Sequence, residues 1–86
     1  MKFEFNKRKS ESNKRKHGID FVEAQALWED PDRIEVPVKT QVEKRFVLTG
    51  RIADSHWSAV FTLRADKTRI ISVRCARKQE VKEYES

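Results

Sequence analysis

The feature that most constrains the fold is a series of three stretches in which apolar and polar side chains alternate, at residues 44–52, 56–64 and 68–75. Alternation with a period of two is typical of β-strands, because successive side chains point to opposite faces of a sheet. The connection at residues 65–67 has the length of a hairpin loop, so at least the last two strands are predicted to pair antiparallel.

The alternation divides the side chains of the predicted sheet between two faces. The apolar face is assigned Phe46, Leu48, Ile52, Trp57, Ala59, Phe61, Leu63, Ile71, Val73 and Cys75. The opposite face is rich in arginine and hydroxyl groups and is assigned Arg45, Val47, Thr49, Arg51, His56, Ser58, Val60, Thr62, Ile70, Ser72 and Arg74. We expect helices to cover only the apolar face. The open face is then either suited to phosphate contacts or simply solvated, as in many antiparallel sheets.

A short strand and an unusual helix are predicted at the start of the chain. Residues 3–5 alternate, and Asn6 is a favourable N-cap for a helix that runs to about His17 and ends at Gly18. This helix contains no aliphatic or aromatic side chain, so it has no apolar stripe. We expect it to pack either against a partner or through the face formed by Ser10, Asn13 and His17.

Three more elements complete the predicted α+β fold. Asp20 and Glu23 form a capping box for a second helix that ends at Asp30 and Pro31. The stripe of that helix, which should face the sheet, consists of Phe21, Ala24, Leu27 and Trp28. Residues 34–38 alternate, and Pro37 restricts them to an edge strand. Residues 77–84 are predicted to form a short terminal helix, with Val81 and Tyr84 at i, i+3 spacing.

Positive charge is concentrated at the N-terminus. Residues 1–17 contain seven Lys or Arg and two Glu, which gives the whole net charge of +5, and the remaining residues carry twelve charges of each sign. Such a block attracts phosphate backbones or an acidic partner, although it is equally compatible with a solvated basic helix.

Length and composition exclude several classes of protein. A chain of 86 residues is expected to form a single domain, residues 1–86. Cys75, the one cysteine, cannot form an internal disulfide, and the spacing of Cys and His does not fit zinc, so we expect no metal, no cofactor and a reducing cytoplasm. No apolar run approaches the ~20 residues of a membrane span. A glycine-rich nucleotide loop, a paired-carboxylate metal site and a nucleophile elbow are also absent from the sequence.

An ordered series of motifs along the chain resembles the BrnT family of RelE-like toxins. The family's N-x-x-K-H-G element and the following F-x-E-A correspond to residues 13–18 and 21–24. Asp30 and Pro31 correspond to its D-P, Gly50 and Arg51 to its G-R, and residues 69–76 to its R-I-I-S-x-R-x-A strand. Residues 80–84 resemble its E-R-x-x-Y ending, so the resemblance covers essentially the whole chain.

The resemblance implies a fold, an activity and partners. The fold would be RelE-like, with an antiparallel sheet, two N-terminal helices on one face and a short C-terminal helix. The protein would be the toxin of a type II toxin–antitoxin pair, a metal-independent ribonuclease that cleaves RNA and blocks translation. Its partner would be a BrnA-like antitoxin with a ribbon-helix-helix part, and their complex would repress its own promoter DNA.

Ribonuclease chemistry without a metal requires a base, an acid and cations around the phosphate. Histidine ordinarily titrates near neutrality, which makes His17 and His56 candidates for proton transfer, although His17 also suits a helix end. Related enzymes use Lys, Arg or Tyr instead, so the predicted catalytic residues are Arg74, Arg69, Lys16, His17 and Tyr84. Arg69 is alternatively a structural partner of Glu80 or another acid. The predicted RNA contacts are Arg51, Ser72, Arg45 and Arg77, with Arg74 as the charge stabiliser.

Three other functions fit the same residues. The chain is alternatively a binding module that holds nucleic acid without cleaving it. It is alternatively an interaction protein whose polar first helix and exposed Val47, Val60 and Ile70 are covered by an antitoxin. The third alternative is an inactive homologue that serves as a corepressor.

Overall fold

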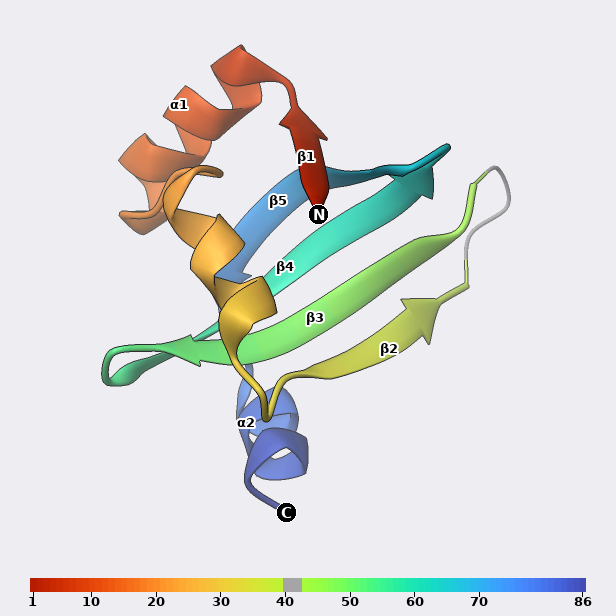
Figure 1. Cartoon of the computed structure of the whole chain (residues 1–86). Coiled ribbons are helices and arrows are strands. Elements are labelled where there is room, and N and C mark those ends of the chain that lie inside the picture. Colours follow the sequence, from red (N-terminus) through yellow and green to blue (C-terminus); the bar gives the residue numbers. More distant parts are fainter. Residues whose placement is uncertain (40–42) are drawn as a thin grey trace.

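A five-stranded sheet forms the centre of the structure, with helices around it (Figure 1). The computed structural model describes residues 1–39 and 43–86. Its elements follow in the order β1 (Lys2–Phe5), α1 (Lys7–His17), the 3-10 helix η1 (Glu23–Glu29), β2 (Ile34–Val38), β3 (Arg45–Ile52), β4 (Ser55–Arg64), β5 (Lys67–Cys75) and α2 (Lys78–Glu85). The chain therefore has an α+β architecture.

The sheet is mixed. Its strand order is β1-β5-β4-β3-β2, and neighbouring strands are antiparallel except β1 and β5, which are parallel. The three long strands predicted from alternation are confirmed to within one residue at each end, and β2 lies at the edge, as Pro37 predicted. The prediction of an antiparallel sheet is wrong for β1, because four alternating residues do not reveal which strand they will pair with or in which direction.

A β-bulge in β5 changes which of its side chains face the core. Val60 pairs with Ser72 and Phe61 pairs with Ile70, so Ile71 is the extra residue of β5. Side chains before the bulge therefore lie on the opposite face from the one that strict alternation predicts. Ile70 is buried, so its predicted assignment to the opposite face is wrong, and Ile71, which was assigned to the apolar face, is only partly buried.

The hydrophobic core lies between η1 and one face of the sheet. The predicted stripe is confirmed, because Phe21, Ala24, Leu27 and Trp28 are all buried, and it packs against Leu48, Ala59, Phe61, Ile70 and Val73. Trp28 contacts Phe3 and Phe61 edge to face, with ring centroids 5.1 and 5.2 Å apart. Leu63 and Cys75, which the alternation assigned to this face, lie near strand ends and are exposed.

The capping signals predicted near both N-terminal helices are present. Asn6 Oδ1 accepts a hydrogen bond from Lys9 N, and Gly18 adopts the left-handed conformation with φ of 82°. Asp20 Oδ1 accepts from Glu23 N at 2.8 Å, and Glu23 Oε1 accepts from Asp20 N at 3.0 Å. The element after this box is a 3-10 helix rather than the predicted α-helix.

α1 packs beside β5 through polar groups. Asn13 Nδ2 donates to Val73 O at 2.9 Å and to Ile19 O at 2.8 Å, and Asn13 Oδ1 accepts from Val73 N at 3.1 Å. Ser10 Oγ accepts from Phe21 N at 2.9 Å. Burial of Ser10 and Asn13 confirms the predicted packing face, but His17 is exposed. β1 pairs only with residues 67–70 of β5, so Asn13 occupies the edge of β5 that β1 leaves unpaired.

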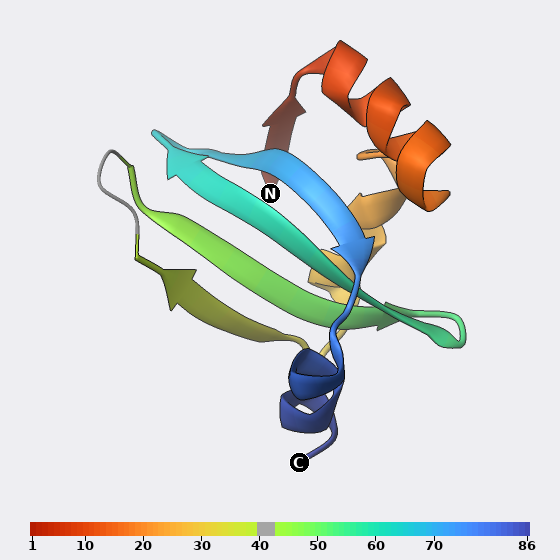
Figure 2. The ribbon, with the colours of Figure 1, turned by 180° about the vertical axis from the view of Figure 1, so that it is seen from behind.

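α2 lies on the sheet face opposite η1, which we call the far face; Figure 2 shows it from behind. Ser58 and Arg74, which point away from the core, both contact Glu80 of α2. The prediction that helices cover only one face is therefore wrong. Thr49, Ser58 and Thr62 were expected to be solvated, but they are 2, 0 and 2% exposed. Contacts between side chains distant in sequence bring α2 here, and the local sequence pattern does not encode them.

Candidate functional site

Polar side chains gather where α2 meets the far face and the end of β3. Six residues, which we call the α2 cluster, contribute from three strands and from α2: Arg51, His56, Ser58, Arg74, Glu80 and Tyr84. Cross-strand pairing sets their spacing, because Arg51 lies opposite His56 and Ser58 lies opposite Arg74. The sheet therefore fixes the backbone positions from which four of these side chains project.

Glu80 is the most heavily bonded residue of the cluster. Its Oε1 accepts from Arg74 Nη1 at 2.7 Å, Arg77 N at 2.8 Å and Ser58 Oγ at 2.9 Å, and its Oε2 accepts from Arg74 Nη2 at 2.9 Å. The hydrogen bonds from Arg74 above all lower the pKa of Glu80 to about 2, and those from Arg77 and Ser58 add to the effect against the opposing effect of burial. The same hydrogen bonds to Glu80 raise the pKa of Arg74.

A hydroxyl chain links this ion pair to the interior of the sheet. Thr49 Oγ1 and Ser58 Oγ lie 2.8 Å apart, and either atom could donate on distance alone. Because the single hydroxyl proton of Ser58 goes to Glu80, Thr49 must donate to Ser58. The buried hydroxyls of Thr49 and Ser58 thus help to anchor α2.

Tyr84 attaches the other end of α2 to the segment between η1 and β2. Its hydroxyl donates to Asp30 Oδ2 at 2.7 Å, and the hydrogen bond raises the pKa of Tyr84 to about 12. Asp30 Oδ2 also accepts from Arg51 N at 2.9 Å, and Asp30 Oδ1 accepts from Asp32 N at 2.9 Å. Burial disfavours the charged form of Asp30, but the hydrogen bonds from Tyr84, Asp32 and Arg51 outweigh it and lower its pKa. Both groups therefore hold one protonation state at neutral pH.

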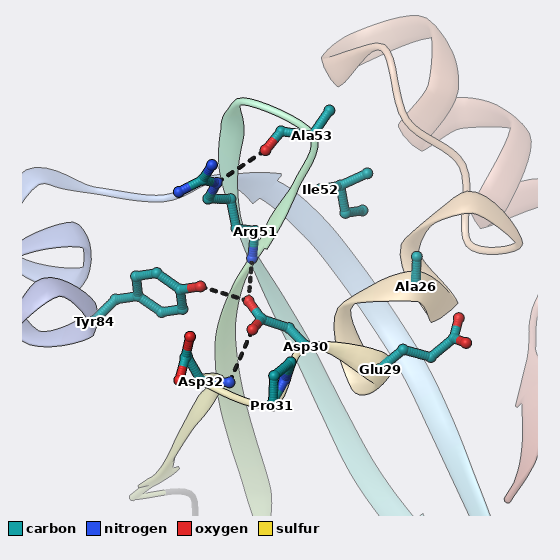
Figure 3. Close-up of a pocket in the computed structure, with 9 residues that line it drawn as sticks. All are labelled: Ala26, Glu29, Asp30, Pro31, Asp32, Arg51, Ile52, Ala53 and Tyr84. Atoms are coloured by element: carbon teal, nitrogen blue, oxygen red, sulfur yellow. Dashed lines mark hydrogen bonds between the residues drawn. The ribbon is translucent and has the colours of Figure 1, made fainter.

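A shallow open hollow of about 520 Å³ lies beside this contact, lined by Ala26, Glu29, Asp30, Pro31, Asp32, Arg51, Ile52, Ala53 and Tyr84 (Figure 3). Arg51 Nε donates to Ala53 O at 2.9 Å, which fixes the plane of the guanidinium. Within residues 1–39 and 43–86, no hydrogen bond engages the two terminal nitrogens of Arg51, and the side chain is exposed. Arg51 can therefore present two parallel N–H groups to an anion.

His56 joins the Arg51 side of the cluster to α2. Its ring packs edge to face on Tyr84 with centroids 5.1 Å apart, and its Nε2 lies 3.3 Å from Glu85 Oε1. The angle of that contact is not that of a hydrogen bond, and Nε2 is buried without a hydrogen-bond partner in the part of the chain that the structure describes. His56 thus lies opposite Arg51 on the neighbouring strand and packs against the tyrosine.

Four of the nine residues predicted for the site lie at this end of the molecule. Arg51, Arg74 and Tyr84 belong to the α2 cluster, and Arg77 precedes α2 with an exposed side chain. Arg74 lies on the predicted face, but its guanidinium is only 25% exposed and is occupied by Glu80. The bulge carries Arg69 to the far face, where it pairs with Glu4 at 3.0 Å rather than with Glu80.

The other predicted residues lie apart from this cluster. Arg45 is near the opposite end of β3, 3.4 Å from Glu43. Lys16 and His17 are exposed in the last turn of α1, and Ser72 is partly buried on β5. His56 was considered for proton transfer and placed on the correct face, but it was not among the nine predicted site residues. Asp30 and Glu80 were noted only as parts of family motifs. Membership in a motif could have pointed to Asp30 and Glu80, but a motif does not specify which side chains are in contact.

Two further kinds of feature are absent from the part of the chain that the structure describes. No group of three or more His, Cys, Asp or Glu within residues 1–39 and 43–86 is arranged to hold a metal ion. Among the same residues, no helix combines the length and apolar character needed to cross a membrane.

The fold and the site together define a small α+β protein whose arginine-bearing sheet face is closed at one end by the C-terminal helix. Residues 5–80 match the family model described as "Ribonuclease toxin, BrnT, of type II toxin-antitoxin system". The chain belongs to this family, which confirms the resemblance seen in its motifs. In general terms, membership implies an RNA substrate and an antitoxin partner. A comparison with curated proteins found no match.

Proposed function

We propose that this chain is an endoribonuclease that cleaves RNA at the α2 cluster with its own side chains. The observation that carries the proposal is the placement of Arg51 opposite His56 on neighbouring strands of the far face, with the His56 ring packed on Tyr84 and the terminal nitrogens of Arg51 free of hydrogen bonds to the described residues. Family membership supplies the class of reaction. The residue roles below follow from the geometry and go beyond what the family alone implies.

Arg51 contacts the scissile phosphate. Cleavage by the neighbouring 2′-hydroxyl forms a bond from the 2′ oxygen to phosphorus and breaks the bond to the 5′ oxygen. Negative charge builds up on the phosphoryl oxygens during this step, and a fixed guanidinium stabilises it. Arg51 suits this role because Nε is hydrogen-bonded to Ala53 O, while its terminal nitrogens form no hydrogen bond with the described residues and its side chain is exposed.

His56 removes the 2′-hydroxyl proton, and the 5′ oxygen leaves with a proton from solvent. The products are a 2′,3′-cyclic phosphate and a 5′-hydroxyl end, so atoms and charges balance. Tyr84 is a poor base, because its pKa of about 12 keeps the hydroxyl protonated and bonded to Asp30. We assign Tyr84 to positioning, through its ring contact with His56.

Arg74 acts mainly through Glu80. Two of its nitrogens bond the Glu80 carboxylate, so its charge is offset before any RNA arrives. Its pairing holds α2, and with it Tyr84, against the far face. The predicted roles of Arg69, Lys16, His17, Ser72, Arg45 and Arg77 stay predictions, since each lies outside the cluster or touches it only through the backbone.

The partner of this toxin, in the same proposal, is an antitoxin of the BrnA kind with a ribbon-helix-helix part. The complex represses its own promoter, with most DNA contacts made by the antitoxin. Co-expression with the neighbouring reading frame should relieve growth arrest, and the purified complex should shift a promoter fragment that the toxin alone does not shift.

The test compares the two histidines of the chain. His56→Asn should lower the rate of RNA cleavage by on the order of 10²-fold or more, the usual contribution of a proton-transfer group. His17→Asn is the matched control and should cleave at the wild-type rate, because His17 is exposed on α1. Primer extension on total RNA after induction, and gel analysis with purified protein, measure the effect.

The chemistry of the new RNA ends tests the mechanism. Wild-type products should carry 2′,3′-cyclic phosphate and 5′-hydroxyl ends, and Arg51→Gln should reduce them while the protein stays folded. Full cleavage by His56→Asn removes His56 from the reaction. Soluble, folded wild-type protein that binds RNA and leaves it intact favours the non-catalytic binding module or the corepressor instead.

A further inference from the structure

The outward side of α1 is an unpartnered surface of one charge. Five cationic residues of α1 are exposed and form no ion pair with any residue that the structure describes; we call them the basic face: Lys7, Arg8, Lys9, Arg15 and Lys16. Lys14 differs, since its Nζ lies 2.7 Å from Glu23 Oε1. The block of residues 1–17 accounts for the full net charge of +5. The basic face is thus the main uncompensated charge of the molecule.

Three of the five cations do not serve the stability of α1, whereas Arg15 and Lys16 lie in its last turn, where cations are favourable. Lys7, Arg8 and Lys9 occupy its first turn, which has no acidic residue. The N-terminus of a helix carries partial positive charge, so cations there are unfavourable. Nor does the basic face contribute to packing, because the buried residues of α1 are Ser10 and Asn13 on its other side. A ligand is a better physical reason for these charges than the fold.

The spacing of the basic face fits an extended polyanion. Arg8 and Arg15 are seven residues apart, which corresponds to two helical turns or about 10 Å along the axis. Lys9 and Lys16 repeat the same interval on the neighbouring row. Paired rows of cations parallel to the axis can follow successive phosphates, whereas a single small anion would use only one turn.

We propose that the basic face of α1 binds the phosphate backbone of RNA outside the cleavage site. The inference rests on the proposed function for the identity of the polyanion. Asn13 holds α1 against Val73, near the end of β5 that leads through Arg74 and Arg77 into α2 (Figure 2). A strand of RNA cleaved at the α2 cluster therefore continues over α1. Contacts there add affinity without sequence preference and leave the chemical step unchanged.

The experiment measures binding apart from cleavage. The probe is a fluorescent single-stranded RNA of mixed sequence with 2′-O-methyl groups, which lacks the attacking hydroxyl. Arg8→Gln/Arg15→Gln should weaken binding on the order of tenfold at 0.1 M salt. It should also reduce the slope of log K against log salt by about 1.4, that is about 0.7 for each lost phosphate contact. Single-turnover cleavage of normal RNA at saturating protein should keep its wild-type rate.

A second double variant controls for net charge. Lys2→Gln/Lys67→Gln removes the same charge at the other end of β5, where the two lysines lie beside Asp66 and Glu4. It should bind the probe within about twofold of wild type if the position of the charge matters more than its amount. Circular dichroism and urea unfolding verify that both variants fold.

The outcomes separate this inference from the proposed function. Equal losses in both double variants, or an unchanged salt slope in the α1 variant, overturn the inference. So does an α1 variant that binds RNA normally but no longer binds the antitoxin, because the basic face then belongs to an acidic protein segment. Wild-type protein that binds the probe through α1 but cleaves no RNA overturns the proposed function and leaves the inference standing.

Discussion

α1 and α2 are both small helices held to the sheet by polar contacts, yet they are held in different ways. An uncharged amide attaches α1, with Asn13 bonded to backbone groups of Val73 and Ile19. A charged carboxylate attaches α2, with Glu80 bonded to Arg74, Ser58 and Arg77. The first kind of attachment leaves the cations of α1 available for a ligand. The second uses a cation of the sheet and makes the position of α2 dependent on pH.

The largest expected effect comes from breaking the attachment of α1. Asn13→Ala removes three buried hydrogen bonds and leaves the peptide groups of Val73 unpaired, which should cost about 3 kcal/mol of unfolding free energy. Urea unfolding measures it. Ser12→Ala, one residue earlier in the same helix, should change stability by less than about 0.5 kcal/mol. Equal effects in the two variants would show that α1 does not depend on the amide.

Breaking the attachment of α2 should have a smaller effect that depends on pH. Glu80→Gln should lower the unfolding free energy by roughly 1 to 2 kcal/mol at pH 7. The loss is no larger because the ion pair is only partly shielded from solvent. Folding lowers the pKa of Glu80 from its ordinary 4.5 to about 2, so its stabilisation is complete above pH 4.5 and is lost as the pH falls toward 2.

Urea unfolding at pH 7 and at pH 3 tests this dependence. The difference in unfolding free energy between wild type and Glu80→Gln should be smaller at pH 3 than at pH 7. Glu83→Gln, a neighbouring exposed carboxylate on α2, should show no gap at either pH. A gap for Glu80→Gln that stays constant with pH is incompatible with the ion pair as the source of the stabilisation.

Tyr84→Phe tests the second contact of α2 and should act locally. The change removes the hydroxyl that donates to Asp30 but keeps the ring that packs on His56. We expect faster hydrogen exchange at the last amides of α2, a loss of stability smaller than that of Glu80→Gln, and reduced cleavage. Exchange measured by mass spectrometry should show no change in α1. Uniformly faster exchange along the whole chain would contradict a local role.

The smallest expected effect has the opposite sign. Arg8→Gln should raise the unfolding free energy by about 0.5 kcal/mol at low salt, because it removes a cation from the positive end of α1. Thermal unfolding at 10 mM and 500 mM salt checks this, since salt should abolish the gain. A loss of stability would mean that Arg8 supports the fold, and the comparison between the two helices would then fail.

Features set by neighbouring residues were predictable from the sequence. Alternation located the three long strands, Pro37 marked the edge strand, and Asn6, Gly18 and the Asp20–Glu23 box marked the helix ends. Each depends on backbone preferences or side-chain contacts within a few residues. The stripe of η1 was correct for the same reason, although the helix that carries it is a 3-10 helix rather than the predicted α-helix.

Features set by distant contacts were not predictable. Nothing in the run Arg69, Ile70, Ile71 signals a bulge, yet the bulge exchanges the faces of these residues and directs Arg69 toward Glu4. The position of α2 depends on Glu80 and Tyr84 meeting partners far away in sequence. For this reason the sequence predicted Arg51, Arg74 and Tyr84 as separate site residues and offered His56 as a candidate for proton transfer, but it did not predict that His56 and Asp30 connect them.

Both margins of the sheet end in the same way. β1 is shorter than β5, and Asn13 bonds the peptide groups of β5 that β1 leaves unpaired. β2 ends opposite Thr49 of β3, and Asp30 accepts a hydrogen bond from the next free peptide nitrogen of β3, that of Arg51. Pro37 offers no N–H along the outer side of β2. Unpaired strand margins invite self-association into fibrils or swapped dimers. The bonded segments of β5 and β3 are therefore protected against pairing edge to edge with copies of the same chain.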